Sequence, residues 1–74
     1  MSTAVATAPR CGQMALVYGG LRLNLQVLES AAGFYIGTTH EDMPYSRESA
    51  EYWRKREAAE QALADGTWTQ RDQP

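Results

Sequence analysis

The feature that most constrains this chain is a short amphipathic stretch near its C-terminal end, RKREAAEQALADGTW, at residues 54–68. Small and apolar side chains recur at helical spacing on one side, and charged or amide side chains occupy the other: Ala58, Ala59, Ala62 and Leu63 against Glu57, Glu60, Gln61 and Asp65. Gly66 stands where such a helix would end, because glycine adopts the left-handed conformation without a steric penalty. The pattern predicts a helix that starts near Arg54, stops at Gly66 and lies flat against a sheet with Leu63 buried.

A second pattern, at residues 14–28, predicts a β-hairpin. Apolar residues flank Gly19-Gly20, a dipeptide suited to the positive φ angles of a tight turn. A turn at these glycines places Tyr18 opposite Leu21, and the same register brings further apolar pairs onto that face: Leu16 opposite Leu23 and Met14 opposite Leu25. No GK[ST] or GxGxxG motif follows the glycines, so the pair indicates a turn and not a phosphate-binding loop.

The middle of the chain predicts one further strand. Residues 34–38 are β-branched and aromatic, with Phe34 and Ile36 on one face. Residues 39–44, THEDMP, are polar and end in proline, so we expect a loop there.

Residues 46–65 allow two interpretations. Their propensity suits one long helix capped by Ser46 or Ser49. In the alternative, which we favour, residues 47–53 form a fourth strand that folds back on the preceding strand, and the helix begins only near Arg54. This interpretation places Tyr52 beside the preceding strand instead of exposing it.

Together these elements predict an α+β fold: a small antiparallel sheet of three to four strands, beginning with the N-terminal hairpin, with one C-terminal helix packed on one face. Residues 1–12 are rich in Ala, Thr and Ser and lack periodicity, so we expect a flexible tail followed by a single domain at residues 13–74. Residues 67–71 form a short edge strand or a tail, and Trp68 folds back over the helix end or the sheet edge.

Composition narrows the function classes. With 74 residues the chain has room for one domain with a thin core, and its net charge of −2 argues against a dedicated nucleic-acid-binding protein. Cys11 is the only cysteine, so no intramolecular disulfide is possible and a reducing compartment is expected. The first residues lack the pattern of a signal peptide, and no run approaches the ~20 apolar residues that span a bilayer. We therefore expect a cytoplasmic protein without membrane contact.

Residues with catalytic or metal-binding chemistry are present but form no recognisable motif. His40 has Glu41 and Asp42 beside it, yet adjacent loop residues rarely converge on one ion. Ser46 or Ser49 with His40 and Asp42 supplies the residue types of a catalytic triad without a nucleophile elbow. We predict no catalytic residues, no metal site and no cofactor, and a protein that is not an enzyme.

An aromatic and basic cluster is the strongest candidate for a binding site: Tyr45, Arg47, Tyr52, Trp53 and Arg54. Trp, Tyr and Arg dominate the energetics of protein interfaces. Glutamates interrupt the positive charge, so a protein partner or a second copy of this chain is favoured over nucleic acid. The alternative is an aromatic pair in the core beside a solvated, salt-bridged face.

Four segments, GFYIGT, SRESAEYW, REAAEQAL and GTWTQR, lie between residues 33 and 71. In this combination the chain resembles short uncharacterised proteins carried on proteobacterial plasmids and integrative mobile elements. The resemblance implies a genomic setting and no activity. The helix in such proteins usually opens with a Thr or Ser cap, whereas Arg54-Lys55 occupies that place here. We expect a non-catalytic accessory protein of a mobile element that acts through protein–protein contact; the alternatives are a nucleic-acid-binding regulator and, less in keeping with the residues, a small enzyme.

Overall fold

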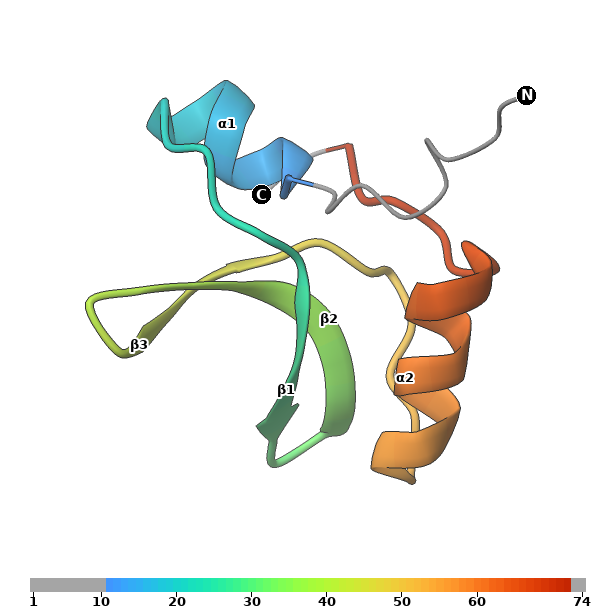
Figure 1. Ribbon diagram of the computed structural model, residues 1–74. Helices are drawn as coiled ribbons and strands as arrows, with labels where there is room; N and C mark the ends of the chain where they lie inside the picture. The colour runs from blue at the N-terminus through green and yellow to red at the C-terminus, as the bar shows by residue number, and fades with distance from the viewer. Residues whose placement is uncertain (1–10, 73–74) are drawn as a thin grey trace.

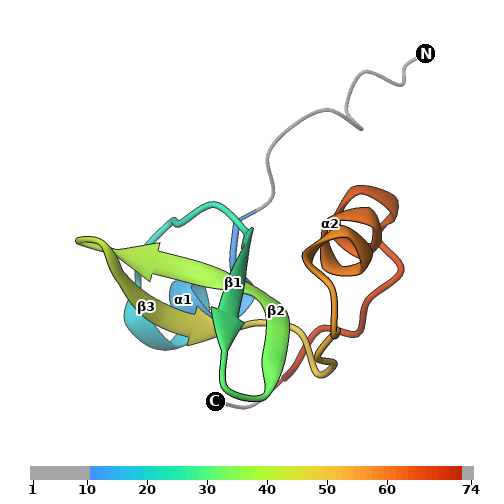
Figure 2. The ribbon, with the colours of Figure 1, turned by 90° about the horizontal axis from the view of Figure 1, so that it is seen from below.

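The centre of the fold is a sheet of three antiparallel strands in the order β1-β2-β3. In the computed structural model, which describes residues 11–72, the element order is α1 (Gln13–Gly19), β1 (Gln26–Ser30), β2 (Gly33–His40), β3 (Met43–Arg47) and α2 (Arg56–Asp65) (Figure 1). α1 contacts β3, whereas α2 contacts β1 and β2, so the helices cover different parts of the curved sheet (Figure 2). The predicted α+β fold, with a small antiparallel sheet and a C-terminal helix against it, is confirmed.

One face of β2 forms the centre of the core. Ile36 and Thr38 share this face through strand alternation, and both are fully buried. Thr38 lies under the start of α1, so close to Gly12 that a Cβ added to this glycine would lie 2.5 Å from Thr38 Cγ2. At the other end of the face, the Arg56 guanidinium of α2 lies over the Phe34 ring at 5.1 Å from its centroid. The predicted strand is confirmed, together with the shared face of Phe34 and Ile36.

The two hairpins of the sheet turn at Ala31-Ala32 and at Glu41-Asp42. Glu41 and Asp42 have positive φ angles of 53° and 66°, which suits a tight connection between right-twisted strands. The loop predicted at residues 39–44 is therefore shorter than expected, because its first and last residues pair with each other in the β2–β3 ladder.

The predicted N-terminal hairpin is wrong, since its first half forms the helix α1. Gly20, at φ 71°, ends this helix; its N–H bonds the Leu16 carbonyl at 3.0 Å, and the N–H of Leu21 bonds the Ala15 carbonyl at 3.1 Å. Tyr18 and Leu21 are therefore not cross-strand partners. A glycine pair suits a hairpin turn and a helix stop equally well, so the local sequence does not separate the two structures.

The chain joins the fold before α1 begins. Cys11 forms an antiparallel bridge with Asn24, and the Gly12 N–H donates to the Leu23 carbonyl at 2.8 Å. Cys11 and Gly12, the last two residues of the predicted tail, are thus paired with the residues before β1. The rest of the predicted tail, residues 1–10, lies outside the described residues.

The residues after β3 continue beside β2, as the favoured interpretation predicts, but they do not form a regular strand. The Ile36 carbonyl accepts the N–H groups of both Glu48 (2.8 Å) and Ser49 (3.0 Å), and Ser49 Oγ accepts the Ile36 N–H. Trp53 then pairs with Phe34 through two backbone hydrogen bonds. The regular strand in this region is β3, which starts and ends earlier than predicted, and the alternative of one long helix is wrong.

α2 starts close to the predicted position and stops at Gly66, which has a φ of 71° and donates its N–H to the Ala62 carbonyl. Ala59 and Ala62 are buried, but Leu63 is only half-buried. Alanine side chains let the helix backbone approach the sheet closely, which leaves the longer leucine at the margin of the contact. The prediction of Leu63 as the buried anchor is wrong.

The segment beyond α2 packs along the residues that follow β3. Ser49 and Gln70 form an antiparallel bridge, and flanking backbone hydrogen bonds join Ala50 N–H to Thr69 O and Arg71 N–H to Glu48 O, each at 2.8 Å. The C-terminal residues thus make a short edge pairing, which the sequence left open between a strand and a tail. Neither helix of the described region is long and apolar enough to cross a membrane.

Candidate binding face beside a buried carboxylate

Glu48 stands out in the core because its side chain is ionisable and fully buried. Its carboxylate accepts hydrogen bonds from the N–H groups of Met14 (2.8 Å) and Ala15 (3.1 Å) in the first turn of α1. Ser46 Oγ and Gln70 Nε2 donate to the same carboxylate at 2.6 and 2.8 Å. Donors from α1, β3 and the C-terminal segment therefore converge on one group, which satisfies the acceptors that burial would otherwise leave unpaired.

This carboxylate replaces the local cap that α1 lacks. The N-cap residue, Gly12, has no side chain, and Glu48 bonds the two amides that a Ser or Asp cap would reach. Gly12 also leaves the necessary room, because a Cβ there would lie 2.6 Å from Glu48 Oε2. The capping group lies 34 residues beyond Met14 in the chain, so the local sequence of α1 does not predict it.

The surroundings of Glu48 keep its side chain ionised. Burial raises the pKa of this carboxyl, but the hydrogen bonds from Met14, Ser46, Gln70 and Ala15 outweigh burial and hold the pKa below its ordinary value. The positive end of the α1 dipole acts in the same direction. A buried carboxylate with a lowered pKa and no access to solvent is poorly suited to take a proton from a substrate. Its contacts indicate that it positions α1 against the sheet.

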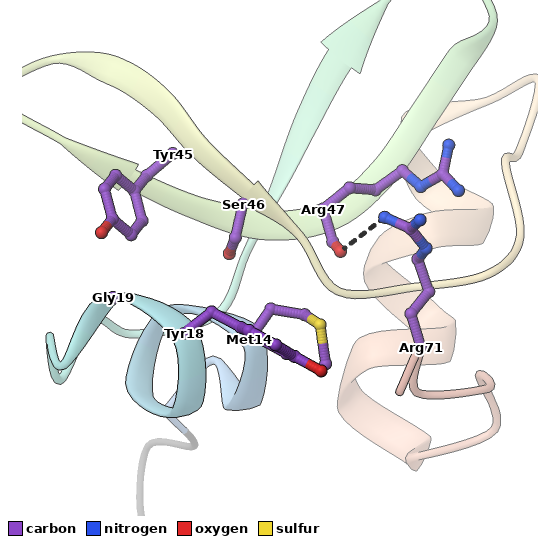
Figure 3. Close-up of a pocket in the computed structure, with 7 residues that line it drawn as sticks. All are labelled: Met14, Tyr18, Gly19, Tyr45, Ser46, Arg47 and Arg71. Carbon is purple, nitrogen blue, oxygen red and sulfur yellow. Dashed lines mark hydrogen bonds between the residues drawn. The ribbon is translucent and has the colours of Figure 1, made fainter. Parts of the chain in front are cut away.

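A cleft of about 300 Å³ opens between α1 and β3, directly beside this network. Figure 3 shows Met14 and Tyr18 on the helix side, Tyr45 and Ser46 on the strand side, and two arginines toward one end. The lining residues are Met14, Tyr18, Gly19, Tyr45, Ser46, Arg47 and Arg71.

A β-bulge directs the strand side of the cleft toward α1. The ladder shifts register between Thr38 and Thr39, so that Tyr45 is left over between the residues that pair with them. Tyr45 and Ser46 consequently both point toward the helix (Figure 3). Tyr45 approaches the end of α1 so closely that a Cβ on Gly19 would collide with its hydroxyl.

The arginine end of the cleft carries positive charge that no carboxylate neutralises within residues 11–72. Arg71 Nη1 donates to the Arg47 carbonyl at 3.4 Å (Figure 3), and neither arginine takes part in a salt bridge in this part of the chain. Glu48, the next residue after Arg47, already accepts four donors. Aromatic walls beside the Arg71 guanidinium suit a ligand that bears a carboxylate.

The structure divides the predicted aromatic and basic cluster. Tyr45 lines the cleft, whereas the Arg47 side chain points away from it (Figure 3) and lies over the Tyr52 ring, with Cζ 4.9 Å from the centroid. Arg47 also donates to the Tyr52 hydroxyl. Trp53 is half-buried beside β2, and Arg54 is exposed. Of the five predicted residues, Tyr45 and Arg47 reach the cleft, and Arg47 does so mainly through its backbone.

Arg47 and Tyr52 belong to a small cluster around Tyr35 on the other face of β2. The Tyr35 ring meets Tyr52 edge to face, with centroids 5.9 Å apart, and is buried. Burial and the neighbouring Tyr52 raise the pKa of Tyr35, and the opposing effect of Arg47 is smaller. Tyr35 is the buried member of this pair, whereas Tyr52 is 38% exposed, so the predicted residue Tyr52 lies at the margin of the core.

Three consecutive apolar side chains of α1 are exposed within the described chain, and at about 3.6 residues per turn they point in different directions around the helix. Leu16, Val17 and Tyr18 are 40%, 63% and 58% exposed, and Tyr45 across the cleft is 43% exposed. We call these four residues, together with the cleft, the α1–β3 face. The core of the domain does not account for three consecutive exposed apolar side chains on a seven-residue helix.

The other residues considered for chemistry do not converge. His40 Nε2 lies 3.5 Å from Glu41 Oε2, and both side chains are exposed. The Ser49 hydroxyl accepts the Ile36 N–H and donates to the Glu51 carbonyl, so it is not directed at a histidine. In the part of the chain that the structure describes, no group of three His, Cys, Asp or Glu side chains is placed to hold a metal ion.

A second cleft, of about 410 Å³, lies near the start of the described chain, and its lining residues are Cys11, Gln13, Leu25, Trp68 and Gln70. Cys11 is exposed there. The Trp68 Nε1 atom is buried without a hydrogen-bond partner among the described residues.

Comparisons with protein-family models, curated proteins and solved structures find no match to this chain. The fold and the α1–β3 face are therefore the grounds for a functional proposal. They describe a small α+β domain that presents an aromatic cleft and an uncovered apolar helix on one side.

Proposed function

We propose that this protein is a non-catalytic binding protein that acts through contact with another protein, and that the α1–β3 face makes the contact. The observation that carries the proposal is the exposure of three apolar side chains, Leu16, Val17 and Tyr18, on a helix fixed from within the domain. Several large apolar side chains exposed on one short helix are typical of an interaction site. The tyrosines and arginines of the adjacent cleft are residue types that dominate interface energetics.

The way α1 is held supports this role. Glu48 bonds the first turn of the helix, and near the other end the Tyr18 hydroxyl donates to the Asp72 carbonyl at 3.2 Å. The first turn is thus tied to the segment after β3, and the other end to the C-terminal segment that pairs with it. A surface fixed before binding loses less conformational entropy when the partner arrives.

Three further elements of the proposal have other support. The resemblance to proteins of plasmids and integrative elements favours an accessory role in a mobile element, and the single cysteine favours a cytoplasmic location. The saturated hydrogen bonding of Glu48 and the exposed position of His40 favour a protein without catalytic activity.

Nucleic acid is the rival ligand. The exposed residues Leu16, Val17 and Tyr18 of α1 carry no charge, and the whole chain has a net charge of −2. Phosphate groups require a basic surface, which these residues do not provide. A gel shift that weakens steeply with added salt would favour the rival.

Site-specific photo-crosslinking in the native host cells tests the proposal. A cross-linking amino acid replaces Val17 in one variant and Ala58, an exposed residue on α2, in the matched control. We expect a defined protein adduct from position 17 and none from position 58. Val17→Asp should lower recovery of that partner by on the order of tenfold, whereas Ala58→Asp should not. Equal adducts at both positions would contradict the proposal. Unchanged recovery of the partner by Val17→Asp, once circular dichroism has shown that this variant is folded, would contradict it as well.

A further inference from the structure

We infer that the α1–β3 face binds a second copy of this chain, whose acidic hairpin tip occupies the cleft; this inference rests on the proposed binding role of the face. The tip is the turn Glu41-Asp42 between β2 and β3, followed by Met43, which is 67% exposed. It extends away from the body of the domain in both ribbon views (Figures 1 and 2). Two carboxylates next to an exposed thioether match the Arg71 guanidinium and the tyrosines that line the cleft.

The charges along β3 are self-complementary. The acidic tip precedes the strand, Tyr45 lies in its middle, and the Arg71 guanidinium lies at its end, where it donates to the Arg47 carbonyl. At about 3.3 Å per residue, Asp42 and Arg47 lie roughly 7–10 Å to either side of Tyr45. A twofold axis near Tyr45 therefore brings the tip of each copy to the arginine end of the other, because an isologous interface pairs each residue i with j and j with i.

The individual contacts have suitable chemistry. Within the described chain, the only acceptor of the Arg71 side chain is the Arg47 carbonyl, at 3.4 Å, so the guanidinium retains donors for a carboxylate. The Met43 thioether of one copy would meet the tyrosine rings of the other, a favourable contact for sulfur. β3 lies at the edge of the sheet, but Pro44 has no N–H with which to extend the ladder. The contact is thus made by side chains and not by a continuous intermolecular sheet.

Charge reversal tests the inference because it can be made in either half of the contact. Sedimentation of the full chain across a wide concentration range should show the mass rising from 8.2 kDa toward twice that value. Glu41→Lys and Arg71→Glu should each abolish this rise, because each creates repulsion between tip and cleft. Mixing the two variants should restore association, since every cleft then faces a tip of opposite charge. Glu57→Lys, the same charge change at an exposed position on α2, is the control and should associate like wild type.

The outcomes separate this inference from the proposed function. A wild-type chain that stays at one-chain mass, a Glu41→Lys variant that associates as Glu57→Lys does, or a mixture that fails to re-associate overturns the inference. The Glu41 side chain is 84% exposed, so Glu41→Lys keeps the test decisive even where Arg71→Glu fails to fold. A one-chain mass together with a foreign adduct from position 17 overturns the second copy as occupant and leaves the proposed function standing. If the chain neither self-associates nor gives an adduct from position 17, the inference and the proposed function are both overturned.

Discussion

The two helices end alike and begin differently. Gly20 and Gly66 each follow a helix at a φ of 71°. At the start, neither N-cap residue supplies a capping hydrogen bond from its side chain. The first amides of α1 are instead bonded by Glu48 from a distant part of the chain, whereas α2 rests on its alanine face and local propensity. α2 is thus specified by its own sequence and α1 by a tertiary contact.

The same difference appears in what each helix exposes. α2 buries Ala59 and Ala62 and presents charged side chains to solvent, as a helix with a purely structural role does. α1 buries Met14 and Ala15 and presents apolar side chains. Because Met14, Ala15 and the bonds to Glu48 hold α1 in place, Leu16, Val17 and Tyr18 remain exposed and available to a partner.

The largest expected effect comes from removing the carboxylate that anchors α1. Glu48→Ala leaves the amides of Met14 and Ala15 without their acceptor in the interior, so it should lower the free energy of unfolding by about 3–5 kcal/mol. Glu60→Ala on α2 removes only an exposed ion pair with Arg56 and should cost less than ~0.5 kcal/mol. Urea denaturation measures both. Similar midpoints for the two variants would mean that Glu48 does not anchor α1.

A bulkier residue at the start of α1 should have the next largest effect. Gly12→Val places a Cβ within 3 Å of both Thr38 and Glu48, so it should destabilise the fold by about 1–3 kcal/mol. Because the collision occurs where α1 meets the sheet, near-ultraviolet circular dichroism and thermal melting should both change. A melting temperature equal to that of wild type would show that α1 can move away from the sheet at little cost.

The contribution of Glu48 should also depend on pH, with a smaller effect than truncation because a protonated carboxyl still accepts hydrogen bonds. The pKa of Glu48 is lowered in the folded chain, so its stabilisation is complete above the unfolded value of about 4.3 and is lost as the pH falls through the folded pKa. Unfolding free energy measured from neutral to acidic pH should decline more steeply in wild type than in Glu48→Gln. Glu51, whose pKa is also lowered, retains its own share of the slope in both proteins. Parallel curves would contradict the role given to Glu48.

The smallest effects should come from the two helix stops, and they should be equal. Gly20→Ala and Gly66→Ala each force a side chain into the left-handed region at the same φ, at a cost of about 1 kcal/mol. A Cβ on Gly20 would meet nothing within 4 Å, so strain alone acts there. Thermal melts of the two variants provide the comparison. A much larger loss at Gly20 would show that the end of α1 is more tightly coupled to the core than its contacts indicate.

These differences explain which parts of the fold the sequence predicts. α2, its stop at Gly66 and the β2 strand follow from local patterns of spacing and residue type, and each is confirmed. α1 does not follow from local patterns, because Gly19-Gly20 suits both a hairpin turn and a helix stop. The interaction that decides between them is the contact of α1 with Glu48. Alternating apolar residues on either side of the glycines then favoured a hairpin that the structure does not contain.

The candidate site was predictable only in part for the same reason. Tyr45 and Arg47 stand out by residue type, and both line the cleft. Tyr18 and Arg71, from opposite ends of the chain, reach it only because α1 and the C-terminal segment fold onto β3. Residue type also grouped Trp53 and Arg54 with the site, although strand alternation and the irregular backbone after β3 direct them elsewhere.

Amide hydrogen exchange provides the most direct measurement of whether Glu48 holds α1 in position. Met14 and Ala15 donate their N–H groups to this carboxylate, whereas the amides of α2 do not depend on it. In Glu48→Gln, the Met14 and Ala15 amides should exchange much faster than in wild type. The exchange of the Ala62 amide should change only as much as the free energy of unfolding of the whole domain changes. Equal protection of Met14 and Ala15 in the two proteins would contradict the anchoring of α1 by Glu48.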